Sequence, residues 1–171
     1  MKTRAIIAFP KFENIDKINA IRNKFDPLAS LIEPHITIVF PFKSELVTEE
    51  IADWLMTALK DFRKFELELC GVSKSSNGYG NYLFLNIQEG CEGFLELNRL
   101  LYKDILSEYK SSLTFNPHLT LGKLSSNELL EDAYIDLENM DTKFRTIIDK
   151  IAVEIIGENQ ESIIEIECNL H

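Results

Sequence analysis

Apolar and polar residues alternate along the chain with two periods, which together predict short strands interspersed with amphipathic helices. Apolar and β-branched runs that end at proline, glycine or polar residues predict strands, and apolar positions three to four residues apart predict helices. The expected strands span residues 3–9, 35–42, 65–70, 82–87, 118–124, 146–156 and 162–168. The expected helices span residues 15–25, 48–62, 94–109 and 128–137, the second with Thr48 as a candidate cap.

The order of these elements predicts an α+β domain. Hairpin signals at Asn77-Gly78 and at Gly157-Glu158-Asn159 favour antiparallel pairing of neighbouring strands. No proline-, glycine- or serine-rich linker divides the 171 residues, and a chain of this length can bury a core of its own. We therefore expect one domain over residues 1–171, with mostly antiparallel sheets and with helices on their outer faces.

A repeated pentapeptide is the most informative feature of the sequence. Pro34-His35-Ile36-Thr37-Ile38 recurs as Pro117-His118-Leu119-Thr120-Leu121, about half a chain length later. The third histidine is the terminal His171, so both internal histidines stand in the same local frame. The repeat predicts two related lobes that face each other across a central cleft.

The strand period decides how each copy presents its side chains. Proline suits the first position of a strand, and the side chains that follow alternate between the two faces of the sheet. In each copy the histidine and the threonine therefore share one face, and the aliphatic residues lie on the other. We expect the aliphatic residues to pack under helices and the four polar side chains to line the cleft.

Two imidazoles and two hydroxyls in one cleft can open a cyclic phosphodiester. Imidazole can act as base or as acid near neutral pH, and hydroxyls can donate hydrogen bonds to nonbridging phosphate oxygens. A lone histidine at a strand start is more often a packing or surface residue, and threonine is common in strands. The shared frame of the two copies favours His35 and His118 as the catalytic pair, with Thr37 and Thr120 as phosphate contacts.

Charge and cysteine content narrow the setting in which the protein works. A net charge of −10, with lysines and arginines scattered among more numerous acids, disfavours a protein that wraps a long nucleic-acid duplex. The three widely spaced cysteines form neither a disulfide framework nor a zinc motif. No apolar run is long enough to span a bilayer. We expect a reduced, soluble, cytoplasmic monomer that acts on a small nucleotide or a short RNA end, away from membranes.

At these residues the sequence resembles the 2H phosphoesterase superfamily, specifically the 2′-5′ RNA ligase/cyclic phosphodiesterase group. The signature of that family is a pair of H-x-[ST]-x motifs, here His35-Ile36-Thr37-Ile38 and His118-Leu119-Thr120-Leu121, and the extension Val39-Phe40-Pro41-Phe42 is also similar. The resemblance implies a bilobed, pseudo-symmetric α+β fold, no metal or other cofactor, and hydrolysis or reversible joining at 2′ phosphate positions of RNA. It also implies a basic residue after the second motif, where Lys123 stands, although strict alternation from His118 points Lys123 away from the cleft.

Other residues are candidate substrate contacts. Aromatic side chains can stack a nucleobase, and each can equally be a core or hairpin residue. The candidates are Phe9, Phe42, Tyr79 and Tyr82 for a base and Lys43 and Lys123 for phosphate. Glu33, near His35, suggests a metal site, but zinc sites usually need three or four protein ligands and the sequence places no third one there. The stretch 73–80 is either a hairpin tip or a segment that closes over substrate.

Two alternatives to a cyclic phosphodiesterase or 2′-5′ ligase of RNA ends stay open. One is a binding module for RNA ends or cyclic nucleotides, which would have little need for two titratable groups kept as a pair. The other is a phosphodiesterase for a small nucleotide such as an ADP-ribose cyclic phosphate, which the acidic net charge favours.

Overall fold

The computed structural model describes all residues, 1–171, and contains eight strands, four α-helices and one 3₁₀ helix. The strands are β1 Lys2–Ala8, β2 Ile36–Ser44, β3 Phe65–Asn77, β4 Gly80–Glu89, β5 Leu119–Leu124, β6 Phe144–Ile148, β7 Lys150–Ile156 and β8 Ser162–Asn169. The helices are α1 Ile15–Phe25, α2 Thr48–Leu59, α3 Cys91–Leu101, the 3₁₀ helix η1 Asp104–Tyr109, and α4 Asn127–Leu137. The predicted α+β class is confirmed.

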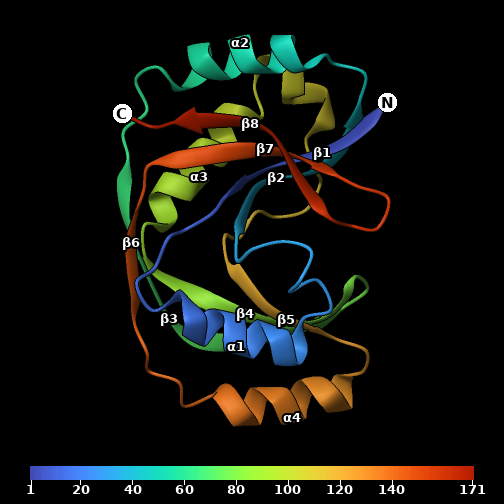
Figure 1. Ribbon diagram of the computed structural model, residues 1–171, viewed down its shortest axis with the longest axis vertical. Helices are drawn as coiled ribbons and strands as arrows, with labels where there is room; N and C mark the ends of the chain where they lie inside the picture. Colours follow the sequence, from blue (N-terminus) through green and yellow to red (C-terminus); the bar gives the residue numbers. More distant parts are fainter.

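All eight strands pair antiparallel in one curled sheet, in the order β6-β3-β4-β5-β2-β1-β7-β8 (Figure 1). The sheet divides into two sets of four strands, which we call the His35 half (β2, β1, β7, β8) and the His118 half (β5, β4, β3, β6). A single residue pair, Ile36 with Leu119, joins β2 to β5 and thereby the two halves. The two predicted pseudo-symmetric sheets are therefore the halves of one sheet, joined directly after the two histidines.

Helices cover only one face of the sheet, which we call the outer face; the opposite face is the inner face. α1 and α4 pack on the His118 half, whereas α2 and α3 pack on the His35 half (Figure 1). α1 follows β1 of the His35 half but packs on the His118 half, and α3 follows β4 and packs on the His35 half. A Cβ at Gly122 in β5 would lie 2.8 Å from the Cβ of Phe25, so glycine allows the end of α1 to approach this strand. The exchanged helices bind the halves together.

Burial alternates along the two central strands as the sequence predicts. Ile36, Ile38, Leu119 and Leu121 are fully buried under the helices, and the threonines between them are half-buried. One hydrophobic core runs beneath the helices through both halves of the sheet. The histidine and threonine of each copy therefore face inward, away from this core.

Three predicted elements differ from the structure. The expected strand 146–156 is two strands: β6 pairs with β3 in the His118 half, and after Asp149 β7 pairs with β1 in the His35 half. The expected helix 94–109 ends at Leu101 and is followed by the separate 3₁₀ helix η1. The strand expected at 65–70 continues to Asn77, so the polar stretch 73–80 is mostly paired strand at a hairpin.

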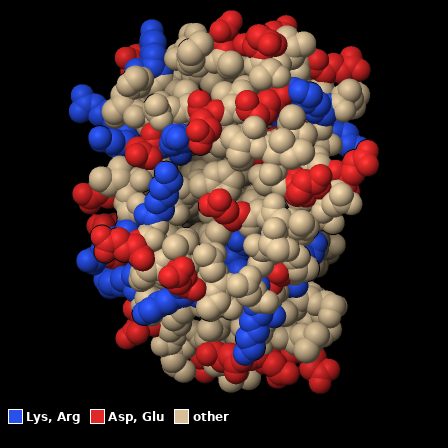
Figure 2. All heavy atoms as spheres, viewed as in Figure 1, with Lys and Arg blue, Asp and Glu red and all other residues tan.

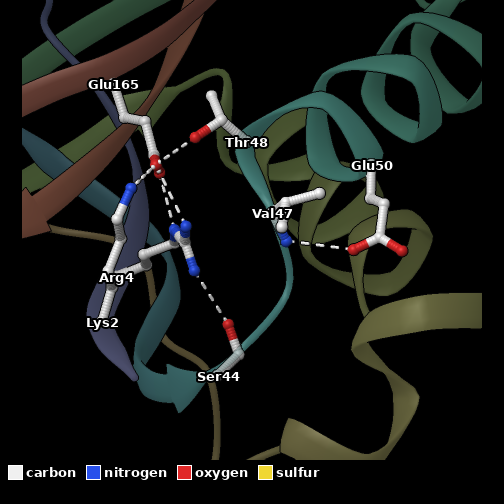
Figure 3. A network of polar contacts seen from close by, with 7 residues as sticks. All are labelled: Lys2, Arg4, Ser44, Val47, Thr48, Glu50 and Glu165. Atoms are coloured by element: carbon white, nitrogen blue, oxygen red, sulfur yellow. Dashed lines mark hydrogen bonds and ion pairs between the residues drawn. The ribbon is translucent and has the colours of Figure 1, made fainter.

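Thr48 has a different role from the predicted helix cap. The N–H of Val47, the residue before α2, donates to the Glu50 carboxylate at 3.0 Å (Figure 3). The Thr48 hydroxyl instead donates to Glu165 at 2.7 Å, within a network centred on that carboxylate (Figure 3). Arg4, which is 1% exposed, donates to both Glu165 oxygens, at 2.6 and 3.0 Å, and to the Ser44 hydroxyl at 3.0 Å. This network ties β1, β2, β8 and α2 together on the outer face.

The surface agrees with the charge pattern of the sequence. On the face seen in Figure 2, lysine and arginine side chains stand among acidic ones and do not gather into one basic stripe. None of the helices has the length and apolarity that crossing a membrane would require.

Candidate active site

The two histidines lie directly before the two central strands. His35 precedes β2 and His118 precedes β5, and the next residues, Ile36 and Leu119, are cross-strand partners. Continued antiparallel register from this pair sets His35 beside Thr120 and His118 beside Thr37, all four on the inner face. The fold thus brings together the four polar residues of the repeated motif, which lie far apart in the sequence.

Both imidazole rings are held in the same way. Nδ1 of His35 lies 3.0 Å from the backbone oxygen of Glu33, and Nδ1 of His118 lies 2.7 Å from that of Asn116. A carbonyl oxygen only accepts hydrogen bonds, so each Nδ1 carries the hydrogen. Each Nε2 is consequently left to accept a proton when the ring is neutral and to donate one when the ring is charged.

The surroundings favour the neutral form of both rings. Burial lowers the pKa of His35 and of His118 below the ordinary value of 6.5, and outweighs the hydrogen bonds to Glu33 and Asn116, which raise it. The positive charge of Arg22 and the charged form of His118 lower the pKa of His35 further, while Asp26 opposes them. Because Ile36 and Leu119, the residues after the two histidines, are cross-strand partners, the two rings lie near each other where the halves join.

A buried ion pair holds the segment that leads to His35. Arg22 in α1 donates from Nε and Nη2 to the Asp26 carboxylate, at 2.9 and 2.7 Å, and from Nη1 to the Ile32 oxygen at 2.9 Å. The side chains of Arg22 and Asp26 are 2% and 5% exposed. The ring of Phe9 meets His35 edge-on, with centroids 6.3 Å apart. The sequence offered one signal for this pair, an arginine and an aspartate four residues apart at the end of a helix.

Two aromatic side chains, those of Phe84 and Tyr82, lie beside His118. The Phe84 ring lies against His118, with centroids 3.9 Å apart, and is nearly parallel to the Tyr82 ring, with centroids 5.8 Å apart. Phe84 pairs across the sheet with Thr120, so both point to the inner face. Phe84 is not among the site residues expected from the sequence, although the alternation Tyr82-Leu83-Phe84-Leu85 puts it on the face of Tyr82.

Lys123 lies on the inner face, contrary to the strict alternation from His118. The β4–β5 register shifts by one residue between Leu83 and Phe84, so Thr120 pairs with Phe84 while Lys123 pairs with Tyr82. A bulge of this kind reverses the side-chain phase of the strand beyond it. The Lys123 ammonium consequently lies 5.6 Å from the centroid of the Tyr82 ring.

The remaining candidate contacts are dispersed. Phe42 is buried in the core on the outer face, against Tyr109, so its assignment as a substrate contact is wrong. Lys43 pairs with Thr3 and is exposed on the inner face, towards the far end of β2 from His35. Tyr79 is 68% exposed at the tip of the β3–β4 hairpin.

A pocket of about 410 Å³ lies next to His35, between the preceding segment and β8. Its wall includes Phe9, Lys11, Glu33, Ile164 and Glu167. No group of three or more histidine, cysteine, aspartate or glutamate side chains converges to form a metal site. Glu33, the residue considered as a metal ligand, contacts His35 through its backbone oxygen, which accepts the hydrogen bond from Nδ1.

Comparison with known proteins places this arrangement in a family. The model of the 2′-5′ RNA ligase superfamily matches residues 10–160 of the chain. A protein of Geobacillus sp. (strain WCH70) named "Putative phosphoesterase" is 28% identical over 151 residues, covering 85% of this chain and 83% of its own. Another "Putative phosphoesterase", from Bacillus pumilus (strain SAFR-032), is 30% identical over 125 residues, covering 72% and 71%.

A solved structure shares the fold over nearly the whole length. Apo LigT of E. coli superposes with a TM-score of 0.67 at 15% identity, covering 99% of this chain and 97% of that one. LigT has also been solved in complex with 3′-AMP, NADP+, ATP and phosphate. With its family model matched over most of its length, the chain belongs to the 2′-5′ RNA ligase superfamily of 2H phosphoesterases.

Proposed function

We propose that this phosphoesterase hydrolyses, or reversibly joins, 2′,3′-cyclic or 2′-5′ phosphodiester bonds of nucleotides or RNA ends without a metal. The observation that carries the proposal is the matched holding of His35 and His118, each with Nδ1 bonded to its own backbone and Nε2 left for the reaction. A phosphate between the rings would have a proton acceptor on one side and a proton donor on the other.

Ring opening follows from this arrangement in one in-line step. The neutral histidine takes a proton from water through Nε2 while the water oxygen bonds to phosphorus. The bond from phosphorus to one ribose oxygen breaks, and the charged histidine gives its Nε2 proton to that oxygen. The product has a phosphate on one ribose oxygen and a hydroxyl on the other, and the two histidines have exchanged protonation states.

Charge on the phosphate must be held while these bonds change. The hydroxyls of Thr37 and Thr120, on the same face, can donate to the nonbridging oxygens. Burial around the histidines strengthens such contacts because the local dielectric is lower than that of water. In the reverse direction, a ribose hydroxyl replaces water as the nucleophile and the two histidines exchange roles.

Small nucleotides or short RNA ends fit the surface better than a long duplex does. The net charge is −10 and lysines are dispersed among acids, so a long phosphate backbone would meet little counter-charge. The LigT complexes with 3′-AMP, NADP+ and ATP support a nucleotide-sized ligand on this fold.

A substrate panel tests the proposal. The wild-type protein would be assayed with 2′,3′-cyclic AMP, RNA ending in a 2′,3′-cyclic phosphate, a 2′-5′-linked dinucleotide and ADP-ribose cyclic phosphate. We expect turnover of at least one of the first three, with an unchanged rate in EDTA. Turnover of ADP-ribose cyclic phosphate alone would reassign the substrate, and binding of these compounds without turnover of any would contradict an enzyme.

A further inference from the structure

A row of aromatic rings leads away from His118 along the inner face of β4. Phe84 touches the histidine, and Tyr82 continues the row with its plane within 11° of that of Phe84. Both side chains are half-buried, so part of each ring is open to solvent. We call the rings of Tyr82 and Phe84 the aromatic platform.

Small neighbours leave the platform uncovered. The cross-strand partners of Phe84 and Tyr82 on β3 are Ser73 and Ser75, whose side chains are too short to lie over the rings. The Ser73 hydroxyl hydrogen-bonds the Asn86 side chain at 2.6 Å, which adds polar groups along one side of the platform. On the other side lies Lys123, with its ammonium 5.6 Å from the Tyr82 ring centroid.

The His35 half has no such surface. Ile7 pairs with Thr37 as Phe84 pairs with Thr120, so Ile7 is the counterpart of Phe84. Ile7 and its same-face neighbour Ala5 are at most 2% exposed, covered by Phe9 and Ile32. Next to His35 the aromatic side chain is that of Phe9, which meets the imidazole edge-on, whereas next to His118 two nearly parallel rings form a surface.

We infer that the nucleobase of the substrate stacks on the aromatic platform, with the ribose phosphate reaching back between His118 and His35. The inference rests on the proposed function and adds the side on which the base of the nucleotide binds and the residues that hold it. Aromatic rings stack on any nucleobase and hold it without strong sequence preference. Lys123 supplies a positive charge where an anionic nucleotide would lie.

The pocket beside His35 suits such a ligand less well. Its wall has two carboxylates, Glu33 and Glu167, against one ammonium, Lys11. Glu167 is paired with Lys150 at 3.2 Å, but the pocket keeps Glu33 and has no pair of stacked rings. The platform has Lys123 as the charged residue among its pairing partners, which suits an anionic nucleotide better.

Tyr82→Leu tests the inference, with Tyr134→Leu as matched control. Tyr134 on α4 also lies under a lysine, with Lys74 Nζ 4.5 Å from its ring centroid, but on the outer face. Each variant would be assayed with 2′,3′-cyclic AMP and with the base-free glycerol 1,2-cyclic phosphate. We expect the ratio of kcat/KM between the two substrates to fall about tenfold in Tyr82→Leu and to stay at the wild-type value in Tyr134→Leu.

Tyr82→Phe separates the ring from its hydroxyl, which donates to the Tyr79 oxygen at 3.0 Å. This variant keeps the stacking surface and should keep the wild-type ratio. An unchanged ratio in Tyr82→Leu, or a tenfold fall in Phe9→Leu instead, would overturn the platform and leave the proposed function standing.

Failure of the proposed function gives a different result. If the wild type turned over no cyclic phosphate, calorimetric titration with 3′-AMP and with ribose 5-phosphate would still test the platform. The platform predicts about tenfold weaker 3′-AMP binding in Tyr82→Leu, with ribose 5-phosphate affected less. Equal affinities of wild type and Tyr82→Leu for 3′-AMP would contradict it.

Discussion

The surroundings of His35 and of His118 differ, although the two motifs hold their histidines alike. Next to His35, a buried Arg22–Asp26 pair fixes the preceding segment, and Phe9 and Ile32 cover the adjacent strand. Next to His118, Phe84 and Tyr82 form an open aromatic surface. The pseudo-symmetry of the fold is therefore kept at the two histidines, whereas their surroundings differ: a buried ion pair lies on one side and an open aromatic surface on the other.

Replacing the histidines is expected to have the largest effect, and an equal one on both sides. His35→Ala and His118→Ala should each lower kcat by about 10²–10⁴-fold, because each removes one positioned proton-transfer group. The double variant should lose less than the product of the two, since the pair acts as a unit. Thermal unfolding serves as the folding control. Wild-type kcat in either single variant would show that the two motifs are not catalytic partners.

Asp26→Asn should reveal the structural role of the His35 side. It leaves the Arg22 guanidinium buried without its countercharge, which we expect to lower the free energy of unfolding by about 3–5 kcal/mol. Because Asp26 opposes Arg22 at His35, the pKa of His35 should also fall further. Denaturant unfolding and an NMR titration of His35 would measure both effects.

The matched control for that variant is Asp136→Asn. Asp136 pairs with Lys24 on the surface, where both side chains are more than half exposed. We expect a loss of at most about 1 kcal/mol. Equal losses in the two variants would contradict a special role for the buried pair.

Glu165→Gln should give a smaller, pH-dependent loss. Hydrogen bonds from Arg4, foremost, lower the pKa of Glu165 to about 2. A lowered carboxyl pKa stabilises the fold above the ordinary value of 4.5, and this contribution is lost as pH falls towards 2. The wild type should thus exceed Glu165→Gln in unfolding free energy at pH 7, and the difference should shrink between about pH 5 and pH 2. A difference in unfolding free energy that stays constant over this pH range would contradict the lowered pKa of Glu165.

Local patterns in the sequence were enough to predict the inward-facing histidines and threonines, because strand alternation is a local rule. Lys123 shows where such a rule ends: the register shift between Leu83 and Phe84 reverses the phase of β5. Gly122 stands at this shift, and a glycine inside a strand is compatible with a bulge but does not fix one. Asp149 is similar, since the apolar run around it reads as one strand but changes partner from β3 to β1. The sequence of β2 also cannot show that Phe42 is a core residue, because its contact with Tyr109 comes from a segment far away in the chain.

The central claim is that His35 and His118 work as one acid–base pair, and the pH dependence of kcat/KM tests it most directly. One histidine must be neutral and the other charged, so the rate should fall both above and below a maximum. Because burial lowers both pKa values, that maximum should lie below pH 6.5, and EDTA should leave it unchanged. A rate that rises steadily through neutral pH, or activity that EDTA abolishes and a divalent ion restores, would contradict the account.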